Sequence, residues 1–339
     1  MPPAAPPSHR NPHRHLPRVR WAVQLAYLAF LVAVGVAFSR FVDEVTAGGA
    51  VTTARPPAVE AFLPISALVA LKRLVLTRTW DGIHPAGLAL LLAALATAAL
   101  ARKAFCSWVC PVGTASRLLE AVGKRLLWRR GWPRVPRGLD LALSSLKYLL
   151  LGFFVVTVFV NMPLEAIAAF LHAPYNLAAD ARMLAFFRHP GALTVAVLSG
   201  LAGLSLVVKH AWCRWLCPYG ALLGVASALS PLRVRRDPAV CNDCRACTRA
   251  CPVEIPVHAR LRVLSPECTG CMSCVSACTV PDCLGVTRAG RRALSPWLVP
   301  AAALAVMLGA WLVARAAGFW ETGVPVEVFR WAYRLAGVS

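Results

Sequence analysis

The sequence predicts an all-α polytopic membrane protein of about five transmembrane helices, with a duplicated two-span unit and an inserted α+β domain. Its 339 residues are 58% hydrophobic and only 15% charged, and the mean hydropathy is +0.61. Soluble domains carry about 25% charged residues, so this composition places most of the chain in a bilayer. A cysteine motif occurs twice in the apolar part and two dense cysteine runs follow it, which predicts the duplication and the insertion.

Five apolar stretches are long enough to span, or nearly span, a bilayer: residues 21–39, 85–101, 139–160, 191–208 and 293–314. A sixth stretch, residues 61–76, is shorter and contains Lys72 and Arg73. Two cations in the middle of a helix are costly in hydrocarbon. We therefore expect a re-entrant or interfacial helix there.

The distribution of basic residues predicts the orientation. Most of the 36 Lys and Arg residues lie in segments 1–20, 101–138 and 209–293, which five spans would place on one side of the membrane. The positive-inside rule assigns this side to the cytoplasm. We expect a multi-pass protein of the bacterial inner membrane, with the N-terminus and inserted domain in the cytoplasm and the C-terminus outside. The net charge of +21 then favours membrane lipid as a partner, and no large soluble domain presents a basic stripe for nucleic acid.

Two segments share the pattern C-x-W-x-C-P-x-G, at residues 106–113 and 213–220. Each has a His-Pro pair and a Glu-Ala pair upstream, at His84 and His189 and at Glu60 and Glu165. Matched landmarks in the same order indicate a duplication. Because both copies have the same orientation, their symmetry axis should lie along the membrane normal.

The expected domains follow from these landmarks. They are a disordered basic tail at 1–18, a first repeat unit at 19–117, a basic cytoplasmic linker at 118–138, a second repeat unit at 139–232, a cysteine-rich domain at 237–290, a fifth transmembrane helix at 293–314 and an outer tail at 315–339. No small-residue cleavage site follows the first span, so we expect it to remain as an uncleaved anchor.

The repeated motif places two cysteines one helical turn apart, before a proline that ends the helix. If the two copies face each other, they supply four thiols for an additional iron-sulfur centre or another metal: Cys106, Cys110, Cys213 and Cys217. The alternative interpretation is buried thiols beside tryptophans of the membrane interface.

The two histidines stand at the outer start of a membrane helix in each copy. His84 and His189 could contact quinol or accept its protons, with Glu60 and Glu165 as their partners. The alternative is that the histidines are polar residues at headgroup level and the two acids are solvated.

Two cysteine runs with the spacing C-x2-C-x2-C-x3-C follow the second motif, and this spacing is typical of two-cluster ferredoxins. In that pattern the fourth cysteine of each run ligates the other cluster. We expect one [4Fe-4S] cluster on Cys241, Cys244, Cys247 and Cys278, and a second on Cys251, Cys268, Cys271 and Cys274. Zinc is the alternative, although zinc sites rarely have three cysteines at this step. Thr279 stands where a proline is usual, and Cys283 fits neither run and is expected to be a small buried residue.

The two C-x3-C-P segments and the double ferredoxin run together resemble a known family. It comprises the membrane iron-sulfur subunit of periplasmic nitrate reductase systems (NapH-like) and the C-terminal membrane half of the nitrous oxide reductase regulator (NosR-like). Residues 55–66 resemble the regulator branch, and the resemblance covers about residues 20 to 290. It implies a membrane protein that moves electrons among quinol, cytoplasmic clusters and a periplasmic partner. The chain has no room for the regulator's flavin domain, so a flavin is not expected.

Three functions are consistent with these sequence features. The first is membrane-bound electron transfer between quinol or a cytoplasmic donor and a periplasmic redox partner, as a component of a quinol dehydrogenase chain. The second is a redox maturation or regulatory factor for a metal-containing oxidase or reductase. The third is a transporter with structural clusters, which is disfavoured because ionisable residues are scarce in the predicted spans: Lys147 is the only basic one, and near the cytoplasmic end of its span it can snorkel.

Overall fold

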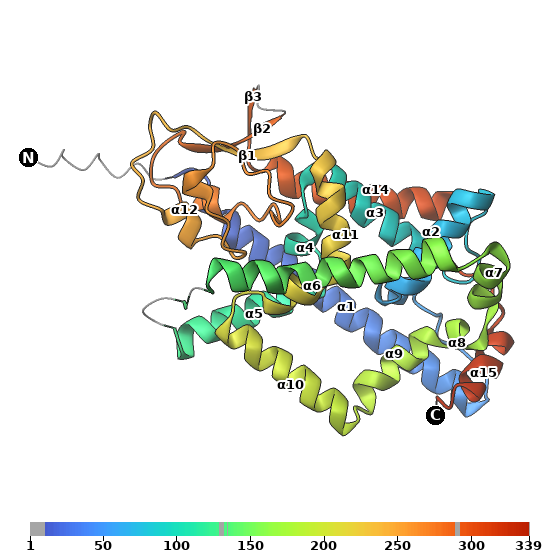
Figure 1. Ribbon diagram of the computed structural model, residues 1–339. Helices are drawn as coiled ribbons and strands as arrows, with labels where there is room; N and C mark the ends of the chain where they lie inside the picture. The colour runs from blue at the N-terminus through green and yellow to red at the C-terminus, as the bar shows by residue number, and fades with distance from the viewer. Residues whose placement is uncertain (1–10, 129–131, 134, 289–291, 339) are drawn as a thin grey trace, which may run out of the picture. The chain divides into compact units, whose positions relative to one another are not determined.

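A computed structural model describes residues 11–128, 132–133, 135–288 and 292–338 (Figure 1). The chain divides into two compact units, each assembled from three stretches of sequence. The first unit holds Met1–Tyr27, Leu95–Lys147 and Leu204–Ala305, and the second holds Leu28–Ala94, Tyr148–Gly203 and Val306–Ser339. The described residues are mostly helical and contain one small sheet.

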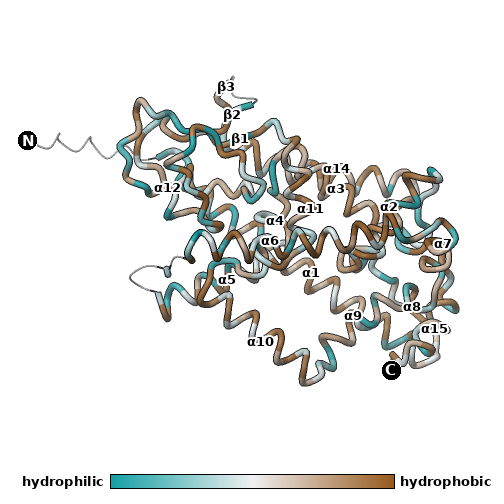
Figure 2. The backbone as a smooth tube through the Cα atoms, viewed as in Figure 1, coloured by the Kyte–Doolittle hydropathy of each residue, from teal (hydrophilic) through white to brown (hydrophobic). Residues whose placement is uncertain are grey.

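Three helices in the described part of the chain are long and apolar enough to cross a membrane: α1 (Leu16–Ala47), Arg137–Asn161 and α14 (Leu298–Ala316). The second consists of α6 (Arg137–Val155) and a π-helical end (Val156–Asn161). A fourth span exists if α9 (Ala179–Arg188) and α10 (Ala192–Val207), bent by 78°, are counted together. Figure 2 shows the apolar character of these helices. The protein is a membrane protein, and five spans remain a prediction.

The shorter apolar helix α3 (Pro85–Ala101) has 17 residues. Ala and Leu, which have high helix propensity, make up most of it. Pro85 occupies the first position, where a missing N–H leaves no hydrogen bond unmade. The helix therefore forms as predicted.

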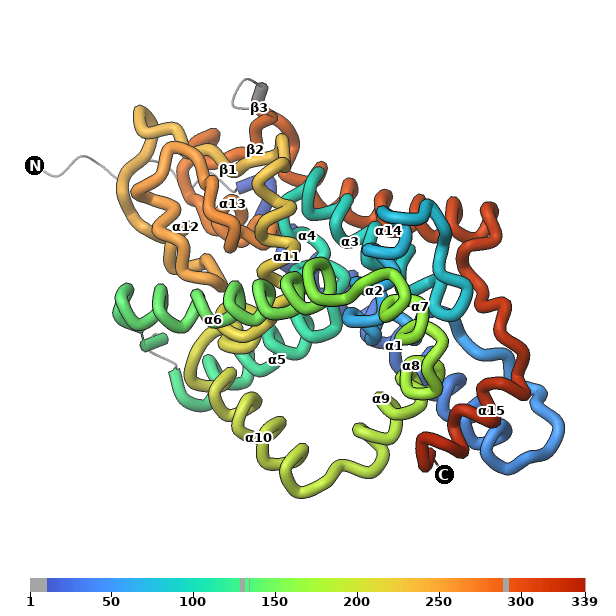
Figure 3. Tube along the Cα trace, turned by 45° about the vertical axis from the view of Figure 1, so that its right-hand side comes forward, coloured from blue at the N-terminus to red at the C-terminus, as the bar shows by residue number. Residues whose placement is uncertain are grey.

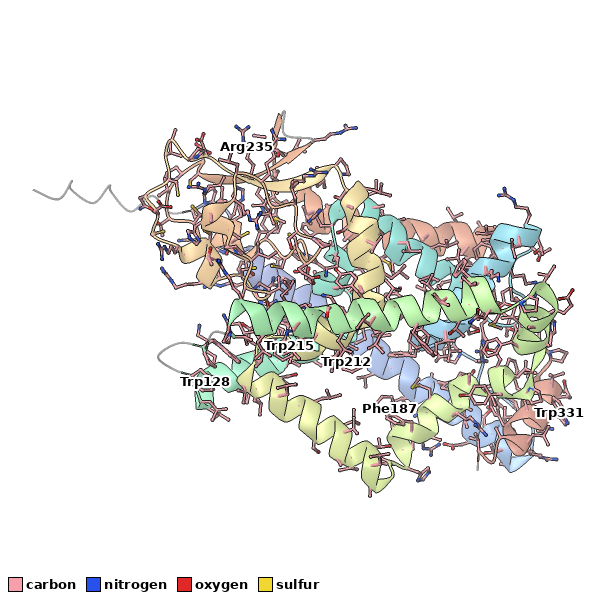
Figure 4. All side chains as sticks on the ribbon, in the orientation of Figure 1. Trp128, Phe187, Trp212, Trp215, Arg235 and Trp331 are labelled. Atoms are coloured by element: carbon pink, nitrogen blue, oxygen red, sulfur yellow. The ribbon has the colours of Figure 1, made fainter. Side chains whose placement is uncertain are left out.

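The first unit contains the inserted α+β domain. Strand β1 (Leu232–Arg236) pairs antiparallel with β2 (Leu284–Arg288), which pairs antiparallel with β3 (Arg292–Leu294). Both cysteine runs lie between β1 and β2, on loops with the short helices α12 (Ala246–Arg249) and α13 (Ser273–Ser276). Figure 3 shows both helices beside the sheet. Along β1, Leu232 and Val234 are buried and Arg235 is exposed, the alternation of a half-buried strand (Figure 4).

The two C-x3-C-P segments also belong to the first unit. The first runs through α4 (Ala104–Trp108) into α5 (Pro111–Leu126), and the second through a π-helical turn (Trp212–Leu216) into α11 (Pro218–Ala226). Gly123 of α5 lies where a Cβ atom would be 2.5 Å from the Leu206 carbonyl oxygen. Only glycine permits this close packing.

The second unit is built around α2 (Pro64–Thr77), α7 (Leu164–His172), α8 (Pro174–Leu177) and α15 (Val326–Leu335). Its core includes Phe41, Val45, Ile167, Leu171 and Phe329. Helix α15 belongs to the predicted outer tail, and it buries Phe329, Ala332 and Tyr333. This part of the tail is therefore integral to the fold of the unit.

Lys72 of α2 is buried, although the sequence suggested that its charge would be costly. Its ammonium donates to the carbonyl oxygens of Val158 at 3.0 Å, Phe159 at 3.1 Å and Met162 at 2.5 Å. These carbonyls lie at the π-helical end that follows α6, where the last carbonyls of a helix need donors. Lys72 thus caps a neighbouring helix.

Two boundaries differ from the prediction. Residues 1–10 of the predicted disordered tail lie outside the described residues, but residues 11–18 form a turn and the start of α1. Asn11 stabilises this turn, because its side-chain amide donates to the carbonyls of Val275 and Cys278, both at 2.8 Å. The predicted helix at 293–314 begins only at Leu298, since the preceding residues include β3.

The predicted cytoplasmic linker, 118–138, contains the second half of α5 and the start of α6. Residues 129–131 and 134 of this linker lie outside the described residues.

Candidate metal centres

Four cysteines from both runs line one cavity. We call this group the buried ferredoxin site, formed by Cys251, Cys268, Cys271 and Cys274. Cys251 and Cys274 are buried. Burial and the thiolates of Cys271 and Cys268 raise the pKa of Cys251 to about 12. The structure therefore places the fourth cysteine of the first run with the second run.

We call the other four cysteines of the two runs the exposed ferredoxin site: Cys241, Cys244, Cys247 and Cys278. Cys244 is exposed to solvent. Burial, followed by the thiolates of Cys278 and Cys244, raises the pKa of Cys247. Cys278 of the second run thus lies with the first.

The two cysteine loops share a backbone conformation. Residues on both sides of the second cysteine have positive φ, at Asp243 (52°) and Arg245 (58°) in the first loop and Gly270 (62°) and Met272 (58°) in the second. Left-handed residues fold each loop tightly, so that its cysteines can face one centre. The equal spacing in the sequence thus produces equal local structure.

Cys283 is buried, as expected from its sequence context. Its thiol donates to the Asp237 carbonyl oxygen at 3.7 Å. Burial and the neighbouring thiolates of Cys278 and Cys241 raise its pKa.

The four cysteines of the repeated motif form a third group, which we call the four-thiol site: Cys106, Cys110, Cys213 and Cys217. Burial and the thiolate of Cys110 raise the pKa of Cys106 well above its ordinary value, and Cys217 and Cys213 add to this shift. Burial and the thiolate of Cys213 raise the pKa of Cys110 to about 12. The two motifs thus bring their thiols within electrostatic range of one another. None of the 13 cysteines, which all lie in the described residues, forms a disulfide.

The motif C-P-x-G builds a helix N-terminus around its cysteine. Cys110 and Cys217 are the N-cap residues of α5 and α11, and proline follows each at the first helical position. The Gly220 N–H donates to the Cys217 sulfur at 3.2 Å. Two helix N-termini therefore face the four-thiol site, and their dipoles favour negative charge there.

The glycine of the motif has a steric role in the first copy. A Cβ atom on Gly113 would lie 2.1 Å from the Cys106 carbonyl oxygen, so no other residue fits without a backbone shift. A Cβ atom on Gly220 would be 3.6 Å from the nearest atom, an ordinary contact.

A basic residue precedes the first cysteine of each motif by three positions, Lys103 in one copy and His210 in the other. Lys103 is paired with Glu267 at 3.0 Å, and His210 Nε2 lies 3.1 Å from Glu120 Oε2. Burial would lower the pKa of His210, but hydrogen bonds to Cys213 and Glu120 raise it to about 9. Both cations favour thiolates at this site. The sequence interpretation missed these two residues, although aligning the repeats would have shown them.

The donor set fits iron-sulfur clusters. Among the described residues, no three His, Cys, Asp or Glu side chains are placed to bind a single metal ion. A single zinc ion holds its sulfur ligands at about 2.3 Å, whereas a cluster spreads four thiolates over several iron atoms. The C-x2-C-x2-C-x3-C spacing of both cysteine runs therefore favours clusters over zinc.

The structure brings together one of the two predicted His and Glu pairs. His84 and Glu60 are buried, with His84 Nδ1 3.5 Å from Glu60 Oε1. Arg55 binds Glu60 at 2.7 Å and Asp180 at 2.8 Å. The Tyr333 hydroxyl donates to Asp180 at 3.3 Å. We call this group the buried ion network.

The His84 ring lies between two oxygen acceptors in this network. Its Nε2 lies 2.9 Å from the Asn176 carbonyl oxygen, an acceptor, and its Nδ1 faces the Glu60 carboxylate. Burial lowers its pKa, but the hydrogen bond and charge of Glu60 raise it overall. His189 and Glu165, the equivalent residues of the second copy, are both exposed.

Comparisons with known proteins agree with the cysteine chemistry. The family model described as "4Fe-4S binding domain" matches residues 83–132 and 190–236, and each stretch contains one C-x3-C-P segment. The model described as "4Fe-4S dicluster domain" matches residues 233–279. No solved structure matches the chain.

Several curated proteins are similar to the chain. An Escherichia coli protein named "Putative electron transport protein YccM" is 41% identical over 327 residues, which cover 94% of this chain and 91% of that protein. "Ferredoxin-type protein NapH" of Haemophilus influenzae is 31% identical over 53% of this chain and 61% of its own length. "Regulatory protein NosR" of Pseudomonas aeruginosa is 29% identical over 51% of this chain and 23% of its own length.

Proposed function

The chain belongs to the iron-sulfur electron transport family that includes YccM and NapH, and we propose that it carries electrons between quinol or a cytoplasmic donor and a periplasmic redox partner. Bound clusters supply one-electron redox chemistry. The apolar helices support a place in the membrane with access to quinol. The cytoplasmic location of the ferredoxin sites rests on the distribution of basic residues.

Twelve of the 13 cysteines would act as ligands in this proposal. The buried and exposed ferredoxin sites would each hold one [4Fe-4S] cluster, and the four-thiol site would hold a third centre. One observation carries the third centre: four neighbouring thiols lie beside two helix N-termini and two cations. The helix N-termini and cations stabilise negative charge on thiolate ligands, which opposes the burial that raises the pKa of Cys106 and Cys110.

The four candidate quinol or proton residues differ in access. His84 and Glu60 have their polar atoms engaged in the buried ion network. His189 and Glu165 are exposed. We therefore assign the quinol or proton role to the exposed pair and a structural role to the buried pair. Exposed thiols at the C-x3-C-P segments would favour the maturation or regulatory alternative, and all four of these thiols are at least partly buried.

Metal analysis of anaerobically purified protein tests the proposal. Two [4Fe-4S] clusters contain about eight irons, and a third centre raises the total further. Changing Cys106, Cys110, Cys213 and Cys217 together to serine should remove the additional iron and leave about eight. Cys283→Ser is the matched control and should retain all the iron. Zinc without iron would contradict the proposal, and an unchanged iron content in the fourfold variant would remove the third centre.

A further inference from the structure

Residues of the first C-x3-C-P segment bind the loop that carries Cys268 and Cys271. The Ser107 hydroxyl donates to the Thr269 carbonyl oxygen at 2.7 Å, and the Trp108 indole N–H donates to the Gly270 carbonyl oxygen at 3.2 Å. Trp108 is fully buried. Successive carbonyls of a cysteine loop are thus held by side chains that lie between Cys106 and Cys110 in the sequence.

The close approach of this loop depends on Gly270. Its φ is +62°, and a Cβ atom there would lie 3.0 Å from the Ala101 carbonyl oxygen and 3.5 Å from the Ala104 side chain. A larger residue would push the loop away from α4. Lys103 adds an ion pair to Glu267, the residue before Cys268.

The second C-x3-C-P segment reaches the same ferredoxin site from another direction. Arg214, between Cys213 and Cys217, is paired with Glu254 at 3.0 Å. Glu254 follows Cys251 by three residues. Residues 102–110 and 210–217 make several hydrogen bonds to the inserted α+β domain. Among the described residues, these bonds end within three residues of a cysteine of the buried ferredoxin site.

The exposed ferredoxin site has different neighbours. Asn11 donates to the Cys278 carbonyl oxygen at 2.8 Å, and Arg236 of β1 interacts with Cys241. Cys244 faces solvent. The two ferredoxin sites are therefore not equivalent.

We propose that the buried ferredoxin site is the direct neighbour of the four-thiol site, with Ser107 and Trp108 as the positioning residues that hold the two together. The exposed site is then the one that a soluble redox partner meets. Electronic coupling between redox centres falls steeply with distance, so this order of sites determines which pair communicates. The inference rests on the proposed function, because it requires iron at the four-thiol site.

Electron paramagnetic resonance of the reduced protein tests this order, because neighbouring paramagnetic centres broaden each other's signals. The signal lost in the fourfold serine variant belongs to the four-thiol site. The broadening of this four-thiol signal should disappear in Cys271→Ser, because that change disrupts the buried ferredoxin site. The broadening should persist in Cys244→Ser, which disrupts the exposed ferredoxin site. The reverse result would overturn the inference.

The duplication provides a matched control for the positioning role. Trp108→Phe keeps the aromatic ring but loses the hydrogen bond to Gly270, so it should reduce the broadening with iron content unchanged. Trp215 occupies the equivalent position, but its indole donates to Asp140 at 2.9 Å. Trp215→Phe should therefore leave the broadening intact. Equal effects of both changes would contradict the role of Trp108.

These results separate the two proposals. If the fourfold serine variant retains all the iron, the third centre and the order of sites are both wrong. If iron is lost but the remaining signals show no change in broadening, only the order of sites is wrong.

Discussion

The two copies of the repeated unit contain the same landmark residues in different surroundings. In the first copy, Glu60 and His84 are buried beside Arg55. In the second, Glu165 and His189 are exposed. The partners Asp180 and Tyr333 come from other parts of the chain. A duplication thus supplies equivalent residues, but the rest of the fold decides which of them are buried.

Glycine positions show the same asymmetry. Gly87 follows His84 by three residues, and its N–H donates to Glu60 Oε2 at 3.0 Å. A Cβ atom on Gly87 would lie 3.2 Å from the Glu60 carbonyl oxygen. The equivalent residue in the second copy is Ala192. Glycine occurs in the copy where a neighbouring segment packs closely against the helix.

The largest expected effect comes from breaking the buried ion network. Arg55→Met leaves Glu60 and Asp180 without their shared cation, and removing one partner of a buried pair costs about 3–5 kcal/mol. Arg188→Met is the control, because its pair with Asp43 has side chains 41% and 53% exposed and contributes at most about 1 kcal/mol. Thermal unfolding in detergent measures both. Similar losses for the two variants would show that the network is not a main source of stability.

The next largest effect is expected for one of the two glycines of the repeated motif, Gly113, and not for the other, Gly220. Gly113→Ala forces a backbone shift next to Cys106 and should cost about 1–3 kcal/mol and lower the iron content of the four-thiol site. Gly220→Ala has room for the methyl group and should retain the iron. Iron analysis and the resonance signal of the four-thiol site provide the measurement. If both variants retain the same iron content, the backbone shift at Gly113 does not disturb the four-thiol site.

A smaller effect on stability is expected from changes in the first turns of α3 and α10. Gly87→Ala pushes the methyl group against Glu60 and should destabilise the protein by about 1 kcal/mol, at the low end for overpacking, because alanine's helix propensity offsets part of the strain. The reverse change in the second copy, Ala192→Gly, is at the first position of α10 and should cost less than the roughly 0.5–1 kcal/mol of a glycine in mid-helix. Thermal unfolding in detergent measures both changes, and a Gly87→Ala variant as stable as the parent protein would show that the close approach to Glu60 adds no strain.

The smallest effect is a pH dependence specific to one histidine. The folded state raises the pKa of His84, because the hydrogen bond and charge of Glu60 outweigh burial, which lowers it. The stabilisation by protonated His84 is fully present below the unfolded pKa of about 6.5 and is lost as the pH rises through the higher folded value. The stability of the protein, measured by unfolding from below pH 6.5 upward, should depend less on pH in His84→Gln than in the parent protein. His189→Gln should behave like the parent protein, and a matching loss in that variant would contradict the assignment.

Sequence patterns determined the parts that depend on local spacing. The cysteine runs predicted two ferredoxin sites because C-x2-C-x2-C-x3-C fixes the loop that wraps a cluster. The matched C-x-W-x-C-P-x-G segments identified the four thiols, since each motif builds its own helix N-terminus. Apolar composition predicted five spans in the same way, and three described helices, or four if the bent pair counts as one span, are long and apolar enough to cross a membrane.

Only the tertiary structure decided which polar groups meet. Lys72 was expected to be costly in a membrane helix, yet it caps carbonyls that lie more than 80 residues away in the sequence. Asn11 was expected to lie in a disordered tail, yet it binds carbonyls of the second cysteine run. Arg55 and Asp180 form a buried pair although they are far apart in the chain. Local spacing fixes helices and metal loops because their geometry involves neighbouring residues, whereas burying a charge requires a partner that only the folded chain supplies.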